Sequence, residues 1–344
     1  MASMDIFKQN AFTSVSLIDG VERIPYVPNF LGSIPNLFID KPVRTTTVAI
    51  EERSGVLGVI QTSPRGAPLV QRTNEKREIR DFRTVRIAEG DRINADEVQD
   101  IRAFGSESEL AQVQDEVTRR FAGPTGIKAN IELTWEYHRL GAVQGVVLDA
   151  DGSTIVDWFS AFGLSQDGEI DFDLDNGSPA SGAVRKKCTQ VVRQTMKGLK
   201  LGSVMPQKIQ IIGLAGDGFW DDLTAHSEVR ETYKYQQEAS ELRKGLAYEE
   251  LYYGEINFMN YHGSDDDTVG IASNECKFFP VLPGLFQRAL SPGESFDFVN
   301  TLGREIYPYV IPDKDRNMWV DVEGYSYPLF ICTRPKALQR AKRT

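Results

Sequence analysis

Cysteine and histidine, on which many metal and redox sites depend, are scarce: the sequence has three of each among 344 residues. Cys188, Cys276 and Cys332 lie far apart, form no CxxC pair and stand in apolar sequence. Because disulfide frameworks and zinc sites use thiols in sets, neither is expected here. We predict that the three cysteines are small buried apolar side chains.

Motifs of catalysis are also missing. His138, His226 and His262 form no HExxH motif, and the chain has neither a Walker A sequence nor a GxSxG elbow. The glycines of GLAGDG (213–218) lack the spacing of a dinucleotide fingerprint and fit a strand-to-helix turn better. The acidic loop 265–267 offers oxygen ligands for a divalent cation, but a solvated turn explains it more simply. We therefore predict a structural His138, no enzymatic activity, no metal and no cofactor.

Long apolar runs are absent as well. No segment has the length needed to span a bilayer, and the N-terminus lacks the basic start and apolar stretch of a signal peptide. The formal net charge is −10, whereas a protein whose main task is to grip nucleic acid is usually basic. These absences favour a soluble intracellular protein without membrane contact, long enough for one large or two medium domains.

The stretch 45–93 is the most informative part of what is present. Two runs of β character, 45–62 and 76–93, predict one long two-stranded ribbon. An isolated two-stranded ribbon is marginal in water, so another surface should cover it, and a neighbouring copy of the chain is the simplest candidate. The predicted tip of the ribbon contains Arg65, Gly66, Ala67 and Pro68.

Charges of both signs alternate along this ribbon. Its basic residues are interleaved with Glu75, Glu78 and Asp81, whereas a nucleic-acid patch would usually lack the acids and carry stacking aromatics. Mixed signs fit salt bridges to another subunit, which set register and partner choice more than affinity. The basic residues predicted to make such contacts are Arg65, Arg72, Arg77, Arg80 and Arg83.

The first 44 residues are predicted to form an extended strap, because prolines recur through them and favour extended backbone. Their large apolar side chains must lie along another surface, which belongs either to the same subunit or to a neighbour. The residues expected to supply this contact include Phe30, Leu37 and Phe38.

Helical and strand periodicities share the rest of the chain, which predicts an α+β fold. Helices are expected over 14–19, 94–103, 106–121, 125–140, 183–199 and 218–226, with a helical or loop stretch over 227–243. A hairpin is expected over 145–162 around Asp151-Gly152. Further strands are expected over 168–174, 208–216, 251–261, 277–282, 319–322 and 327–333.

Three runs stand in a recognisable order: TTTVAIEERSGVLGVIQTSPRGAPLVQRTNEKREIRDFRTVRIAEGDRI, GIKANIELTWEYHRLGAVQG and KIQIIGLAGDGFWDDLTAH. In this order they resemble the major capsid protein E family of tailed phages, over most of the chain. The resemblance implies the tailed-phage capsid fold. Its parts would be an N-terminal arm (1–44), an E-loop hairpin (45–93), a peripheral domain with a long spine helix (94–180), an axial domain (181–290) and a return to the peripheral domain with the C-terminal tail (291–344).

The same resemblance implies a self-assembling homo-oligomer, built as hexamers and pentamers of an icosahedral virion around packaged double-stranded DNA. It also implies assembly in the host cytoplasm with a scaffolding protein and a portal, and in some relatives a decoration protein. Some relatives join subunits by a Lys–Asn isopeptide bond, but the nearness of Lys76 and Asn74 in one loop gives no reason to expect it here. The alternatives are another phage structural component, or an α+β enzyme, which would need a convergent polar site.

Overall fold

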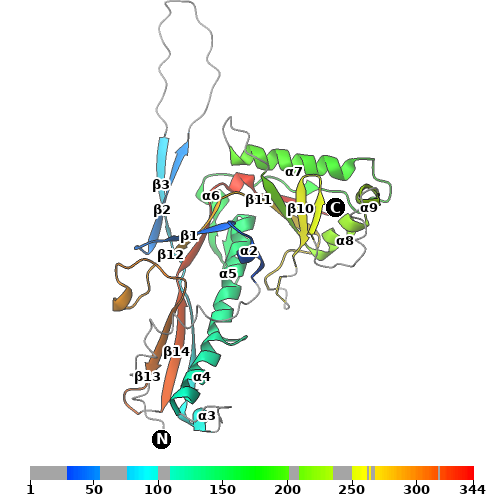
Figure 1. Ribbon diagram of the computed structural model, residues 1–344. Helices are drawn as coiled ribbons and strands as arrows, with labels where there is room; N and C mark the ends of the chain where they lie inside the picture. Colours follow the sequence, from blue (N-terminus) through cyan, green and yellow to red (C-terminus); the bar gives the residue numbers. More distant parts are fainter. Residues whose placement is uncertain are drawn as a thin grey trace, which may run out of the picture.

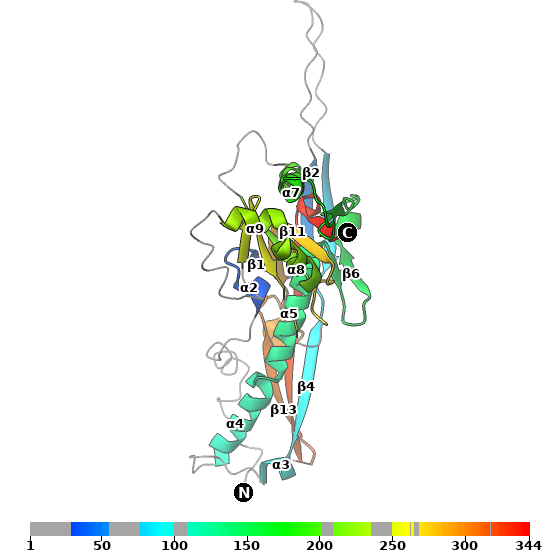
Figure 2. The ribbon, with the colours of Figure 1, turned by 90° about the vertical axis from the view of Figure 1, so that its right-hand side faces the viewer.

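The computed structural model describes residues 29–54, 76–99, 109–200, 209–234, 250–261, 263–264, 268–316 and 318–344. Its helices and strands, which confirm the predicted α+β class, form an elongated body along helix α5 (Ile127–Gln144). A β ribbon stands away from this body, and a lobe of sheet and helices lies at its side (Figure 1). Figure 2 shows the ribbon and the body almost in line when the molecule is turned. No helix within these ranges is both long and apolar enough to cross a membrane.

Helix α5 forms the axis of the body, and helix α4 (Glu109–Ala122) precedes it. The helical stripe predicted from the sequence is buried, including Ile127, Ile131 and Trp135. Leu133, which the sequence added to the same apolar surface, is instead 45% exposed. The stripe therefore marks the side of α5 on which the sheets pack.

The end of α5 is fixed by Gly145, whose φ of 91° is left-handed and whose N–H donates to the carbonyls of Gly141 and Ala142. A Cβ at this position would lie 2.3 Å from the ring of Phe159, so glycine is required. The predicted hairpin follows as β5 (Val146–Leu148) and β6 (Thr154–Asp157). Its continuation as a strand to residue 162 is wrong, because Asp157 caps the short helix α6 (Trp158–Ala161).

A three-stranded antiparallel sheet lies along α4 and α5, in the order β13 (Tyr307–Pro312), β14 (Trp319–Ser326) and β4 (Ile87–Asn94). Residues of β14 alternate between buried and half-buried, as in a sheet with one covered face. The prediction of one ribbon strand over 76–93 is wrong. Strand β3 (Lys76–Arg83) ends first, and β4 leaves the ribbon to pair with β14.

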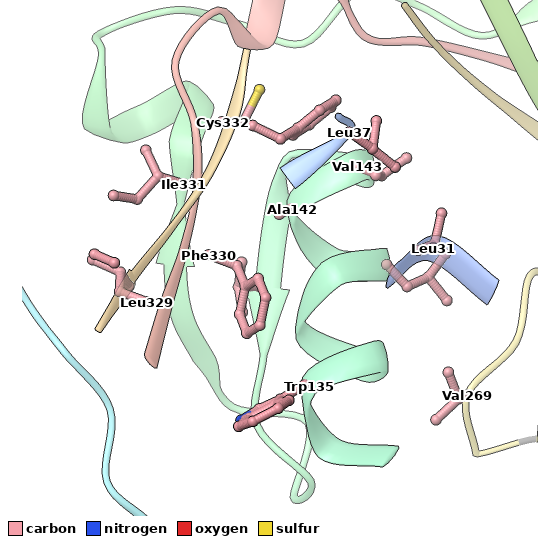
Figure 3. Packing of buried hydrophobic residues seen from close by; sticks show 14 of the residues in the cluster. Leu31, Leu37, Trp135, Ala142, Val143, Val269, Leu329, Phe330, Ile331 and Cys332 are labelled. Carbon is pink, nitrogen blue, oxygen red and sulfur yellow. The ribbon is translucent and has the colours of Figure 1, made fainter. Parts of the chain in front are cut away.

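A second three-stranded sheet covers the middle of α5, in the order β1 (Phe38–Pro42), β12 (Phe286–Leu290) and β15 (Pro328–Cys332). Strand β1 runs parallel to β12, and β15 runs antiparallel to it. Figure 3 shows Phe330 of β15 directed toward α5 above Trp135, with Leu37 beside Val143. These side chains belong to the main core of the subunit.

The side lobe is a six-stranded mixed sheet with its own core. In spatial order its strands are β7 (Ile170–Asp171), β16 (Gln339–Lys342), β11 (Glu275–Val281), β8 (Gln210–Ala215), β10 (Ile256–Asn260) and β9 (Glu250–Tyr253). Its helices are α7 (Ala183–Leu199), α8 (Asp217–Ala225) and α9 (Ser227–Lys234). One predicted strand over 251–261 is wrong, because Gly254 and Glu255 take positive φ values of 58° and 69° and fold it into the β9–β10 hairpin.

Sheet membership does not follow all the predicted domain boundaries. Strand β16, in the predicted C-terminal tail, pairs with β11 and β7 in the side lobe. Strand β7 joins that sheet from within 94–180, whereas β12 lies outside it although it falls within 181–290. Strand pairing is non-local, and these short runs carry no pattern that specifies a partner strand.

Short helices complete the described chain: α2 (Phe30–Ser33), α3 (Ala95–Gln99), η5 (Phe296–Phe298) and η6 (Pro335–Ala337). Helix α3 is the described part of the helix predicted over 94–103, and the helix predicted over 14–19 lies outside the described residues.

Candidate intersubunit surfaces

The ribbon consists of β2 (Thr47–Ser54) and β3, paired antiparallel in a register that places Thr47 opposite Arg83. At its root, Phe82 packs on Trp158 with ring centroids 5.1 Å apart. Further out, Ile79 is 67% exposed, and Figure 1 shows the outer end of β2 and β3 standing away from the body. Among the described strands, β2 and β3 pair only with each other. Neither outer edge of the ribbon is therefore covered by another described strand, and such edges are ready to pair with another chain.

The ribbon residues predicted to contact a neighbour differ in the interactions that they make within their own subunit. Arg80 pairs with Glu78 of its own strand at 3.0 Å and lies 5.7 Å over the ring of Phe162. Arg83 is exposed and makes no ion pair with any described residue, and Arg77 stands further along β3. Those outside the described residues are Arg65, Gly66, Ala67, Pro68 and Arg72. Arg83 is thus more available to another chain than Arg80, which is already paired within the ribbon.

The strap residues predicted to contact a neighbour also differ in how far their own subunit buries them. Leu37 is fully buried in the core of its own subunit, so its side chain has no surface to offer a neighbour. Phe38 packs on Phe286 and Phe330 at 5.3 and 5.7 Å. Phe30 stays 36% exposed. The described strap therefore lies on its own subunit, one of the two surfaces that the sequence left open, and an intersubunit role for these residues stays a prediction.

A buried polar cluster fastens the strap to α5. Glu136 Oε1 accepts the backbone N–H of Leu31 at 2.7 Å and the hydroxyl of Tyr261 at 3.3 Å. Arg139 donates to Asn29 Oδ1 at 2.5 Å and pairs with Glu136 at 3.3 Å. Burial raises the pKa of the Glu136 carboxyl, while the Leu31 N–H and Arg139 hold it down in part. The cluster links the strap, the axis helix and the end of β10.

A second buried arginine fastens β1. Arg288 of β12 donates to both carboxylate oxygens of Asp40, at 2.7 Å each, and also pairs with Glu305. Its guanidinium lies 4.9 Å from the centroid of the Trp135 ring. A planar guanidinium suits this bidentate and stacked arrangement, which lysine could not reproduce.

The histidine and cysteine side chains that could take part in catalysis or metal binding are buried in the fold wherever they are described. His138 is buried with the rings of Phe330 and Tyr137 at 6.2 Å each, and burial lowers its pKa to about 4. The three cysteines are free and buried, as predicted. No group of three potential metal ligands occurs within the described ranges; His262 and 265–267 lie outside them.

A family model described as phage major capsid protein E matches residues 13–343. The chain belongs to this family. The major capsid protein of Salmonella phage Felix O1 (isolate Felix O1-VT1) is 27% identical over 359 residues, covering 94% of each chain. That of Pseudomonas phage KPP10 is 26% identical and covers 89% of this chain and 90% of its own. A chain in the capsid of Myoviridae phage XM1 has a TM-score of 0.52 at 10% identity, covering 93% and 95%, which shows a shared fold.

As a major capsid protein, the chain is a virion component whose shell is built from many copies. The resemblance found in the sequence is thereby confirmed. What sequence reasoning missed are the two arginine-centred clusters around Arg139 and Arg288. Their partners Asn29 and Asp40 lie 110 and 248 positions away, and no local pattern signals such pairs.

Proposed function

We propose that the subunits assemble as hexamers and pentamers of an icosahedral head, and that the β2–β3 ribbon is an E-loop that clasps a neighbouring copy. The observation that carries this proposal is that the described part of the subunit leaves the outer part of the ribbon uncovered. Its root packs on the body through Val48, Ile50 and Phe82, while Ile79 further out is exposed and neither edge pairs with another described strand. A two-stranded ribbon needs further contacts for stability, and adjoining copies in a shell are placed to supply them.

The predicted contact residues make different kinds of contact in this proposal. The tip from Arg65 to Pro68, with Arg72 and Arg77, meets the adjoining subunit. Arg83 supplies a charge that sets register, and Phe30 supplies apolar area at the exposed side of the strap. Each contact is weak, because exposed ion pairs contribute about 0–1 kcal/mol each. Closure of the shell is nevertheless cooperative, because every contact is repeated in all copies.

The head encloses packaged double-stranded DNA without sequence-specific binding. The net charge of −10 supports an inner surface that does not adhere to DNA. Assembly takes place in the host cytoplasm with a scaffolding protein and a portal, with a decoration protein as a further partner. The task is structural rather than enzymatic and uses no cofactor.

Expression of the full chain, alone and with a scaffolding protein, tests the proposal by negative-stain microscopy and sedimentation. Closed shells or capsomer rings are the expected result. A well-behaved monomer that resists assembly under every such condition would contradict it.

A further inference from the structure

An apolar loop between β12 and β13 projects from the body. Phe296, in the short helix η5, is 97% exposed, and Val299 and Leu302 are 54% and 50% exposed. No other described large apolar side chain is as exposed as Phe296; the next, Ile79, reaches 67%. Figure 1 shows the loop standing out from the body below the ribbon. We call these three side chains the apolar knob.

The knob is held on a fixed support. Phe298, two residues after Phe296, is buried and packs edge-on against Tyr307 with ring centroids 4.7 Å apart. The Tyr307 hydroxyl accepts the N–H of Arg304 at 2.7 Å and donates to the carbonyl of Ser291 at 3.0 Å. Both ends of the loop are thus bound to one buried ring. Phe296 is therefore held outward while its neighbour Phe298 is buried, so the exposure does not come from a failure of the loop to pack.

The loop is also tied to the root of the ribbon. The N–H of Gly303 donates to the carbonyl of Val43 at 2.9 Å, and Ser291 Oγ donates to the carbonyl of Thr45 at 2.8 Å. Val43 and Thr45 lead directly into β2. A Cβ at position 303 would lie 2.0 Å from the carbonyl oxygen of Leu290, so this close approach requires glycine. These two hydrogen bonds connect the loop that carries the knob to the segment that leads into the ribbon.

We propose that the apolar knob packs against a second copy of this chain in the shell, at a contact distinct from that of the ribbon tip. The inference rests on the proposed function, because that function places copies around the ribbon root. Acids flank the knob: Asp297 is exposed, and Glu294 is paired with Arg86 at 3.1 Å. An apolar centre with a charged rim is the usual anatomy of a protein contact, in which aromatic anchors carry most of the binding energy.

Replacement of Phe296 tests the contact with little effect on the subunit, because the side chain is 97% exposed. Phe296→Ser should leave the melting temperature unchanged and raise the subunit concentration needed for shells by about tenfold or more. Phe296→Leu keeps apolar area and should restore most of the assembly. Equal assembly by the wild-type protein and Phe296→Ser would overturn the proposal.

Photo-crosslinking identifies the partner directly. Benzoylphenylalanine at position 296 in assembled shells should give covalent dimers on a denaturing gel, with mass spectrometry placing both peptides in this chain. The same probe at the buried position 298 should give crosslinks within one chain only. Shells in which position 296 attaches to another protein, or yields no dimer, would overturn this inference but leave the proposed function standing. Failure of the unmodified chain to form shells would overturn both.

Discussion

Arg288 donates two hydrogen bonds of 2.7 Å to Asp40, one from Nε to Oδ1 and one from Nη2 to Oδ2, and so fastens β1 to β12. The pair is asymmetric in burial. The Arg288 side chain is 7% exposed, whereas those of Asp40 and Glu305 are 47% and 57% exposed. Loss of the acids would leave a buried cation without a partner, but loss of the arginine would leave two hydrated acids.

The double variant Asp40→Asn, Glu305→Gln should therefore lower the free energy of unfolding of the subunit by about 3–5 kcal/mol. Arg288→Met should cost less, because it removes the buried charge itself. Urea unfolding measures both. Asp321→Asn is the matched control, since Arg92 and Asp321 have the same two-bond geometry at the surface and should barely move the midpoint. Equal losses from the double variant and from Asp321→Asn would contradict this account.

His138 should make the subunit sensitive to acid. Burial holds its pKa at about 4, below the ordinary 6.5, so the folded subunit keeps it neutral while the unfolded chain takes up a proton below about 6.5. The free energy of unfolding is therefore unaffected by His138 above about pH 6.5. It declines as the pH falls toward about 4, by up to about 3 kcal/mol. Burial raises the pKa of Glu136, so that residue acts in the opposite direction over the acid range.

His138→Leu isolates the histidine, because Glu136 is present in both proteins and cancels in the difference. Urea unfolding over the range from about pH 7 to about pH 4 should show wild-type stability falling relative to that of the variant. Parallel stability curves for the two proteins would rule out the histidine as the cause.

Leu37 and Phe30 should separate the two roles of the strap. Leu37→Ala removes a fully buried side chain and should cost the subunit about 2–5 kcal/mol, measured by denaturant unfolding. Phe30 is 36% exposed, and its ring packs on that of Tyr261 with centroids 5.7 Å apart. Phe30→Ala should therefore lower the free energy of unfolding of the subunit by less than Leu37→Ala does. If Phe30 meets a neighbour, this variant should nevertheless lose shells, as counted by microscopy. Normal shell yield from Phe30→Ala would remove it from the intersubunit surface.

Charge reversal on the ribbon should distinguish Arg83 from Arg80. Arg83 is exposed and without an ion pair among the described residues, so Arg83→Glu should leave folding unchanged and lower shell yield by about tenfold, since a small loss repeats at every contact. Arg83→Lys keeps the charge and serves as the control. Arg80→Glu should also disturb the ribbon itself, because Arg80 pairs with Glu78. Sedimentation of expressed particles gives the yields, and normal heads from Arg83→Glu would show that this charge does not set register.

Local patterns predicted the parts of the fold that depend on nearby residues. The buried stripe of α5 and the hairpin turn at Asp151-Gly152 follow from helical spacing and turn chemistry. The break between β3 and β4 was missed, because the alternation of 76–93 continues through a point where β14, more than 200 positions later, takes over the pairing. The β9–β10 hairpin was missed because Glu255 takes a left-handed conformation uncommon for its residue type.

The candidate surfaces also combine features that are visible in the local sequence with features that depend on the folded chain. Mixed charge and missing cover in the ribbon are visible in the sequence, and so the ribbon was singled out. The burial of Leu37 in its own subunit and the pairing of Arg80 with Glu78 depend on the folded backbone, so no local pattern signals them. Phe296 and Phe298 have the same residue type two positions apart, and only the fold shows that the first is exposed and the second is buried.

A cryo-microscopy map of assembled particles tests the central claim most directly. The ribbon of each subunit is expected to lie against an adjoining copy, with Ile79 and Arg83 in contact with that copy. A closed shell in which the ribbon lies against its own subunit, or stands free of every neighbour, would contradict it.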